Sequence, residues 1–194
     1  VRNDSTGCID TLVKLIKFSN IDSFRFTTST KMGCKPLTVT LTAVEDTNIV
    51  AYLWDIGNGT LVFGNNYVAK YFNEGKFVVK MFVKYRNGCV MESTQKDTIT
   101  VIGVKPNFNF DKASGCVPAI INLKDTSQSR FSPLSNYTWN FHDGSTASGS
   151  EVSHTFNALG SFPVKLTVEN QYGCKDSITK PVTISEVKAD FDID

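Results

Sequence analysis

The chain has 194 residues, of which 41% are hydrophobic and 20% are charged, and its formal net charge is +1. A charge so close to neutral excludes the strongly basic surface by which proteins hold nucleic-acid phosphates, so we expect no nucleic-acid partner. No apolar run approaches the ~18 residues of a membrane-spanning helix, so we expect no membrane insertion by this segment.

In chain order, the sequence predicts strands separated by short turns and no helix. Near residue 40, apolar residues alternate with threonines, as in a strand with one buried face: Leu37, Val39 and Leu41. The next strand carries Trp54 at its centre. A longer strand follows with the same alternation, at Phe77, Val79, Met81 and Val83. Glycine and asparagine at residues 57–59 and 87–88 predict turns after these strands.

The same order of elements then recurs, which makes the chain a tandem repeat. Trp54 and Trp139 are 85 positions apart, whereas Cys34 and Cys116 are 82 positions apart. The difference predicts an insertion of three residues before the second Trp strand, around residues 129–135. We expect two full repeats at 22–103 and 104–185, the last strand of a preceding repeat at 1–21, and the start of a following repeat at 186–194. The chain is then a segment of a longer array.

Short, half-buried strands at regular spacing predict an all-β fold, namely tandem immunoglobulin-like antiparallel β-sandwiches. The central strand of each repeat points its tryptophan inward, so we expect Trp54 and Trp139 to be core residues.

Two segments carry a resemblance to a known family. Residues 52–59 read YLWDIGNG and residues 137–144 read YTWNFHDG, and each is followed by Gly-x-Phe-x-Val. This pattern resembles the PKD (polycystic kidney disease) domain over nearly the full length of both repeats. The departures include Asn140 and His142 in the second repeat, and Lys70, which we place opposite His154 in the alignment of the repeats.

A second pattern narrows the resemblance. Each repeat has Gly-Cys-x-Pro near its start, at residues 33–36 and 115–118, and has a later Gly-Cys. These motifs are similar to repeats in large surface proteins of Bacteroidetes, including gliding-motility adhesins and cargo of the type IX secretion system. The resemblance implies an extracellular, cell-surface location.

The sequence shows no catalytic constellation, so we predict that the segment is not an enzyme and needs no cofactor. The two histidines, His142 and His154, form a conceivable metal or catalytic pair, but the resemblance implies a structural role for His154. Calcium is an alternative because Asp55, Asn58 and Asp143 offer oxygen ligands. However, Asp and Asn beside Gly are also what a tight turn selects.

The five cysteines recur at fixed positions of the repeat, which favours disulfides in an oxidising compartment over reduced, buried thiols. Cys34 and Cys89 lie in loops at opposite ends of a sandwich, about 20–25 Å apart for strands of seven residues. A disulfide needs Cα atoms within about 7 Å. We therefore favour a bond between repeats, Cys34–Cys174, with the partners of Cys8, Cys89 and Cys116 outside this segment. Pairing within each repeat, as Cys34–Cys89 and Cys116–Cys174, stays open.

One face of the first repeat is a candidate partner surface. Its outward residues are Leu53, Val78 and Phe82, flanked by Lys80 and Lys84, whereas the second repeat has Thr138, Pro163 and Thr167 at the same places. Coverage by a neighbouring loop or repeat is the alternative.

These observations support three hypotheses about function. The first is a non-catalytic stalk of a large secreted adhesin, acting in adhesion or gliding motility, with neighbouring repeats of the same chain as its partners. The second is an accessory module of a secreted hydrolase that grips a surface polysaccharide or protein. The third is a subunit-binding module of a secretion or motility machine.

Overall fold

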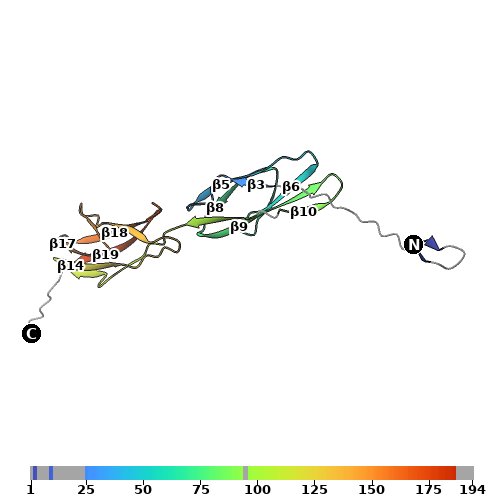
Figure 1. Cartoon of the computed structure of the whole chain (residues 1–194). Coiled ribbons are helices and arrows are strands. Elements are labelled where there is room, and N and C mark those ends of the chain that lie inside the picture. The colour runs from blue at the N-terminus through green and yellow to red at the C-terminus, as the bar shows by residue number, and fades with distance from the viewer. Residues whose placement is uncertain (1, 4–8, 11–24, 94–95, 187–194) are drawn as a thin grey trace, which may run out of the picture.

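The structure is a computed structural model that describes residues 2–3, 9–10, 25–93 and 96–186. Two β-sandwiches lie end to end, and β11 leads from the first toward the second (Figure 1). Within the described residues every regular element is a β-strand, so the predicted all-β sandwich fold is confirmed. These residues include no helix that is long and apolar enough to cross a membrane.

The first sandwich pairs a three-stranded sheet with a six-stranded one. The smaller sheet has the order β3 (Phe26–Thr28), β5 (Leu37–Ala43), β8 (Asn66–Tyr71). The larger sheet has the order β4 (Met32–Cys34), β11 (Asp97–Ile102), β9 (Gly75–Tyr85), β6 (Ile49–Asp55), β7 (Leu61–Phe63), and β10 (Val90–Glu92) also pairs with β9.

The second sandwich repeats this plan. Its smaller sheet has the order β12 (Phe108–Phe110), β14 (Ala119–Asp125), β17 (Glu151–Phe156). Its larger sheet has the order β13 (Ser114–Cys116), β19 (Lys175–Ser185), β18 (Gly160–Asn170), β15 (Leu134–Asn140), β16 (Thr146–Ser148).

Ahead of the first sandwich, β1 (Arg2–Asn3) pairs antiparallel with β2 (Ile9–Asp10). The other residues of the strand expected at 1–21 lie outside the described residues, and so does the following repeat expected at 186–194, except Glu186.

Each sandwich contains one parallel pair that the expected antiparallel plan did not include. The chain leaves β3 and crosses to the other sheet, where β4 runs parallel to β11 with Cys34 opposite Ile102. In the second sandwich β13 runs parallel to β19 with Cys116 opposite Ser185. Each Gly-Cys-x-Pro segment therefore begins on a strand at the edge of the larger sheet, at the end where that repeat's last strand finishes.

Strand register corrects one detail of the alignment between the repeats. Val39 pairs with Ala69 in the first sandwich, and its counterpart Ile121 pairs with His154 in the second. The counterpart of His154 is therefore the fully buried Ala69, and the placement of Lys70 there was wrong by one residue. A slip of one residue matters because successive side chains of a strand point to opposite faces.

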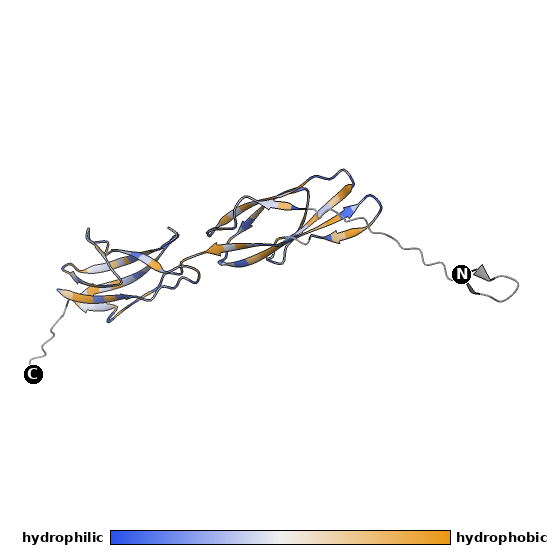
Figure 2. Ribbon diagram, viewed as in Figure 1, coloured by the Kyte–Doolittle hydropathy of each residue, from blue (hydrophilic) through white to orange (hydrophobic). Residues whose placement is uncertain are grey.

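Each sandwich has its own core, and hydrophobic residues recur along the strands of both (Figure 2). Trp54 is fully buried, packs edge-to-face against Phe26 at 5.2 Å between ring centroids, and donates its indole N–H to the Gly64 carbonyl at 2.7 Å. Trp139 makes the same contacts with Phe108, at 5.0 Å, and with Gly149, at 2.9 Å. The expectation that both tryptophans lie in the core agrees with this packing.

Replacing Trp54 by alanine should destabilise the first repeat by about 3–5 kcal/mol, because the change leaves a cavity and an unpaired carbonyl. Urea unfolding followed by circular dichroism measures the effect. Phe63→Ala in the same repeat is the matched control, since Phe63 is 77% exposed and its loss should change stability by less than about 0.5 kcal/mol. Equal stability of the two variants would contradict the core assignment.

Candidate functional site: the joint between the repeats and an exposed sheet face

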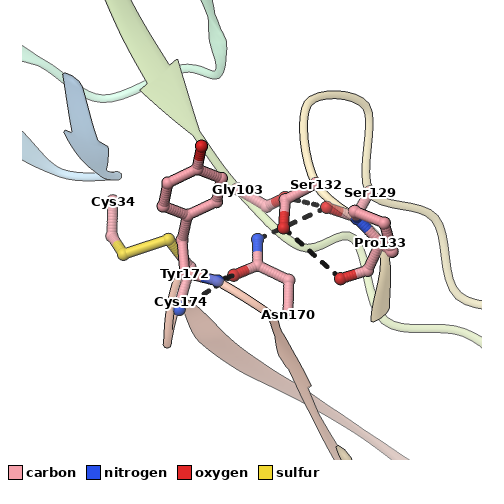
Figure 3. The surroundings of a disulfide bond; sticks show 8 residues. All are labelled: Cys34, Gly103, Ser129, Ser132, Pro133, Asn170, Tyr172 and Cys174. Carbon is pink, nitrogen blue, oxygen red and sulfur yellow. Dashed lines mark hydrogen bonds between the residues drawn. A yellow bond between two sulfur atoms is a disulfide. The ribbon is translucent and has the colours of Figure 1, made fainter. Parts of the chain in front are cut away.

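A disulfide joins the two repeats. Cys34, at the end of β4, is bonded to Cys174, which follows the turn between β18 and β19, and their Cα atoms are 5.3 Å apart (Figure 3). This is the pairing that the distance argument favoured over bonds within each repeat. Cys174 is buried in the hydrophobic cluster of the second sandwich, and the partly buried Cys34 packs against the same cluster.

The linker between the repeats is part of the second core. Ile102 and Val104 are almost fully buried and pack in the hydrophobic cluster of the second sandwich, although Ile102 belongs to the last strand of the first. Between them, Gly103 accepts a hydrogen bond at its carbonyl from the Ser129 hydroxyl at 3.1 Å. The side chains of Lys35 and Glu74 lie against Gly103. A Cβ at this position would be 3.0 Å from Cδ of Lys35 and 3.3 Å from Oε2 of Glu74.

The three-residue insertion of the second repeat also lies at this joint. Its loop runs between β14 and β15, spans residues 126–133, and contains Ser129. On the same loop, the Phe131 ring has the Lys76 ammonium 5.9 Å from its centroid, and this lysine belongs to the first repeat. The longer loop thus brings a hydroxyl and an aromatic ring to the preceding repeat.

Asn170 holds the turn that presents Cys174. Its side chain is almost completely buried, and its Oδ1 accepts the backbone N–H of Tyr172 at 3.0 Å and of Cys174 at 3.1 Å. Its Nδ2 donates to the Ser129 hydroxyl at 3.4 Å, and Figure 3 shows this chain of contacts running from the turn to Gly103. Buried polar groups arranged in this way resist movement because breaking one contact leaves an unpaired partner.

An ion pair completes the joint. The Lys35 ammonium lies 3.2 Å from the Asp176 carboxylate, and both side chains are partly exposed. Pairs of this kind contribute about 0–1 kcal/mol, so this ion pair adds little to the stability of the joint.

The candidate partner surface on the first repeat is an apolar hollow of about 180 Å³. Leu53 lies opposite Phe63 on one side and Phe82 on the other, and both Leu53 and Phe82 are half-buried. The short edge strands add Phe63 and Val90, which are 77% and 66% exposed and which the sequence alternation did not single out. Val78 lies farther along β9, opposite Thr98, and does not line the hollow.

The lysines expected to flank this surface differ in position. Lys84 lines the hollow opposite Val90, whereas Lys80 pairs with Asp55 farther along the sheet. At the corresponding positions the second repeat has only polar side chains: Thr138, Ser148 and Thr167. The two repeats therefore share a framework but differ on this face.

Comparisons with known proteins identify the framework. Residues 23–97 and 105–185 each match a protein family described as PKD domain. The chain belongs to the PKD domain family. It carries two PKD domains in tandem, which are immunoglobulin-like, non-catalytic modules found in extracellular proteins.

Individual relatives are distant. Collagenase ColA of Bacillus cereus is 26% identical over 125 residues, and the match covers 57% of this chain and 12% of that protein. Among solved structures, the PKD1 domain of Vibrio anguillarum Epp is 20% identical, with a TM-score of 0.40, and covers 44% of this chain and 96% of its own. The PKD1 domain of the Vibrio cholerae metalloprotease PrtV is 20% identical, with a TM-score of 0.39, and covers 43% of this chain and 98% of its own.

The oxygens considered as calcium ligands serve the turns of the PKD domains. Oδ1 of Asp55 accepts the N–H of Gly57 at 2.9 Å, Oδ1 of Asn58 that of Thr60 at 3.0 Å, and Oδ1 of Asp143 that of Ser145 at 3.0 Å. In the part of the chain that the structure describes, no three His, Cys, Asp or Glu side chains are grouped so as to hold a metal ion.

The second PKD domain contains a small polar cluster that sequence reasoning did not assemble. Asp143 accepts hydrogen bonds from the Ser145 hydroxyl at 2.5 Å and from Nε2 of His154 at 2.6 Å. The His154 ring stacks on Phe141 at 3.8 Å between centroids. His142 lies in the adjacent turn with a positive φ of 57°, and its backbone N–H donates to Oδ1 of Asn140 at 2.8 Å.

The cluster has the residue types of a catalytic triad but a different order of contacts. In a triad the histidine uses one ring nitrogen for the serine and the other for the aspartate. Here the same nitrogen, Nε2 of His154, lies 2.6 Å from Asp143 and 3.4 Å from the Ser145 hydroxyl, which itself donates to Asp143. The arrangement ties the turn after β15, which belongs to the larger sheet, to β17 in the smaller sheet of the same domain.

Stability of the second domain should depend on the ionisation of Asp143. Partial burial alone would raise the pKa of Asp143, but hydrogen bonds from Ser145 and His154 outweigh it and lower the pKa from 3.8 to about 2. Because the folded-state pKa is depressed, the stabilisation is present above the ordinary pKa and is lost as the pH falls from 3.8 toward 2. The difference in unfolding free energy between the parent and Asp143→Asn should shrink over that range, as measured by thermal unfolding at a series of pH values. A difference that stays constant with pH would refute the assignment.

Proposed function

We propose that this chain is a non-catalytic spacer segment of a large extracellular surface protein, in which successive PKD domains hold a functional part away from the cell and transmit force. The observation that carries the proposal is the joint: a disulfide, a buried linker and a hydrogen-bonded turn lie together between the two domains. A module that works alone gains nothing from a cross-link to its neighbour, whereas a stalk gains resistance to bending.

The Gly-Cys-x-Pro and Gly-Cys motifs support a narrower assignment. Because both half-cystines of the joint come from these motifs, the motifs mark domains that are built to be cross-linked in series. We place the segment in an adhesin or gliding-motility protein of the Bacteroidetes type that is exported by the type IX secretion system.

Rigidity of the joint tests the spacer proposal. In nuclear magnetic resonance relaxation measurements on the parent, both domains should show the rotational correlation time of one body. In a Cys34→Ser, Cys174→Ser double variant each domain should reorient faster, because the cross-link no longer limits their relative motion. A Cys89→Ser, Cys116→Ser double variant is the matched control, since both residues are free and exposed, and it should behave as the parent does. Independent tumbling of the two domains in the parent would refute the proposal.

A second candidate function is ligand binding by the apolar hollow of the first domain. The similarity to collagenase ColA supports an accessory module of a secreted hydrolase, and the hollow is the surface on which such a module would grip a polysaccharide or protein. The same surface would serve a subunit-binding module. Because the corresponding positions of the second domain are polar and that domain still folds, the apolar lining of the hollow favours a role other than folding.

The hollow can be tested with a substitution and its counterpart. Phe82→Lys should lower binding at least tenfold, as loss of a central aromatic contact does, whereas Thr167→Lys at the equivalent position of the second domain should have no effect. Pull-down with insoluble polysaccharides and with fibrillar collagen measures binding, and thermal unfolding confirms that both variants fold. Binding that is equal in the two variants, or absent in the parent, would remove this candidate.

A further inference from the structure

Among the described residues two cysteines are free, Cys89 and Cys116, and they occupy the positions that Cys174 and Cys34 occupy in the other domain. Cys89 follows the turn between β9 and β10, as Cys174 follows the turn between β18 and β19. The backbone of the two turns matches as well: the Tyr85 N–H donates to the Cys89 carbonyl at 2.8 Å, and the Asn170 N–H donates to the Cys174 carbonyl at 3.1 Å. Cys116 ends β13, beside the last strand of its domain, as Cys34 ends β4.

Neither Cys89 nor Cys116 can bond to the other described cysteine of its own domain, because Cys34 and Cys174 are already bonded to each other. In the first domain the distance also excludes such a bond. Gly75 begins β9 and pairs with Val101, next to the position of Cys34, whereas Tyr85 ends β9 near Cys89. Ten residues of strand at 3.3 Å each separate these ends by about 33 Å, far beyond the ~7 Å that a disulfide allows. Cys89 thus lies at the upstream end of the pair of domains, and Cys116 lies at the downstream end.

The upstream end of the first domain has a hollow. The corresponding surface of the second domain is the one that contacts the first domain at the joint. The hollow has a volume of about 470 Å³ and is lined by Asn48, Tyr85, Arg86 and Asn87. In the second domain the counterparts are Pro133, Asn170, Gln171 and Tyr172, three of which Figure 3 shows at the joint. The hydrogen bond that organises this surface recurs, from Arg86 N–H to the Asn48 carbonyl at 2.8 Å and from Gln171 N–H to the Pro133 carbonyl at 3.0 Å.

At the downstream end, near Cys116, two neighbouring residues differ from their counterparts at the existing joint. At the existing joint, a Cβ on Gly103 would meet the Lys35 side chain at 3.0 Å. At the downstream end Glu186 stands in the place of Gly103, and the shorter Val117 stands in the place of Lys35. The larger linker residue, Glu186, therefore has a smaller neighbour, Val117. This leaves room for a following domain to pack at this end.

We propose that Cys89 and Cys116 are the exposed halves of two further joints, and that each forms a disulfide with another PKD domain of the same protein. The partner of Cys89 is a Gly-Cys-x-Pro loop of the preceding domain, and the partner of Cys116 is a Gly-Cys turn of the following domain. The inference deepens the spacer proposal, on which it rests for the presence of neighbouring domains. Each bond forms as two thiols lose two protons and two electrons to a small disulfide such as oxidised glutathione, which becomes two reduced thiols.

An extended chain tests the Cys116 half. Residues 1–186 are followed by a second copy of residues 104–194, with Cys116→Ser in the added copy and Cys8→Ser throughout. After oxidation with glutathione and denaturation, one free thiol, that of Cys89, should remain, and peptide mapping should show Cys116 linked to Cys174 of the added copy beside the existing Cys34–Cys174 link. Three free thiols would overturn the proposal.

A mirror-image chain tests the Cys89 half. Residues 1–103 are followed by residues 22–194, with Cys89→Ser in the first copy and Cys8→Ser throughout. One free thiol, that of Cys116, should remain together with a Cys34–Cys89 peptide that joins the two copies. Again, three free thiols would overturn the proposal.

Control variants fix which copy is bonded. Cys174→Ser in the added domain of the first chain, or Cys34→Ser in the added domain of the second, should abolish the new linked peptide and leave two free thiols. A new peptide that persists in these controls would show pairing within a domain and would overturn the proposal. If neither chain forms its new disulfide while the parent still tumbles as one body, the proposal for Cys89 and Cys116 would be refuted. The spacer proposal would then remain intact.

Discussion

The last strand of the first domain ends inside the core of the second, and the geometry of the chain depends on this sharing. Ile102 is paired in the β-sheet of one domain and buried in the hydrophobic cluster of the next, so neither domain is complete at this boundary without the other. Burial of Ile102 and Val104 fixes the depth at which the domains meet. That depth places the Gly-Cys-x-Pro segment against the Gly-Cys turn, where the disulfide joins them.

The two domains use one framework and differ where they meet other surfaces. Tryptophan, its edge-to-face partner and its carbonyl acceptor recur in both, since each domain needs a large ring to fill the space between its sheets. On the outer face, however, Leu53 and Phe82 are replaced by Thr138 and Thr167. Ala69, which is buried in the first core, is replaced in the second domain by the partly exposed His154, whose ring stacks on Phe141 and contacts Asp143. The framework sets the fold, and these exchanges give each domain its own surface.

Much of the fold follows from alternation and spacing, because side chains of period two mark a half-buried strand wherever the run is long enough. The buried tryptophans could be worked out on that basis, and so could the conclusion that Cys34 and Cys89 are too far apart to form a disulfide. The short strands β4, β7, β10 and β13 could not, since three residues show no period, and they supply the parallel edge pairs as well as Phe63 and Val90 of the hollow. The burial of Ile102 could not be predicted either, because its exposure is decided by the neighbouring domain rather than by its own strand.

The cross-link also sets how far the chain can lengthen. Cys34 and Cys174 are separated by 140 positions, and the intervening segment forms a closed loop that contains both tryptophans. Tension applied at the two ends of a fully unfolded chain would pass from residue 34 to residue 174 across the sulfur atoms and leave this loop slack. A reduced chain would add roughly 460–500 Å of extended backbone at that point. The oxidised protein therefore has a built-in limit to its extension, even after all of its hydrogen bonds have been broken.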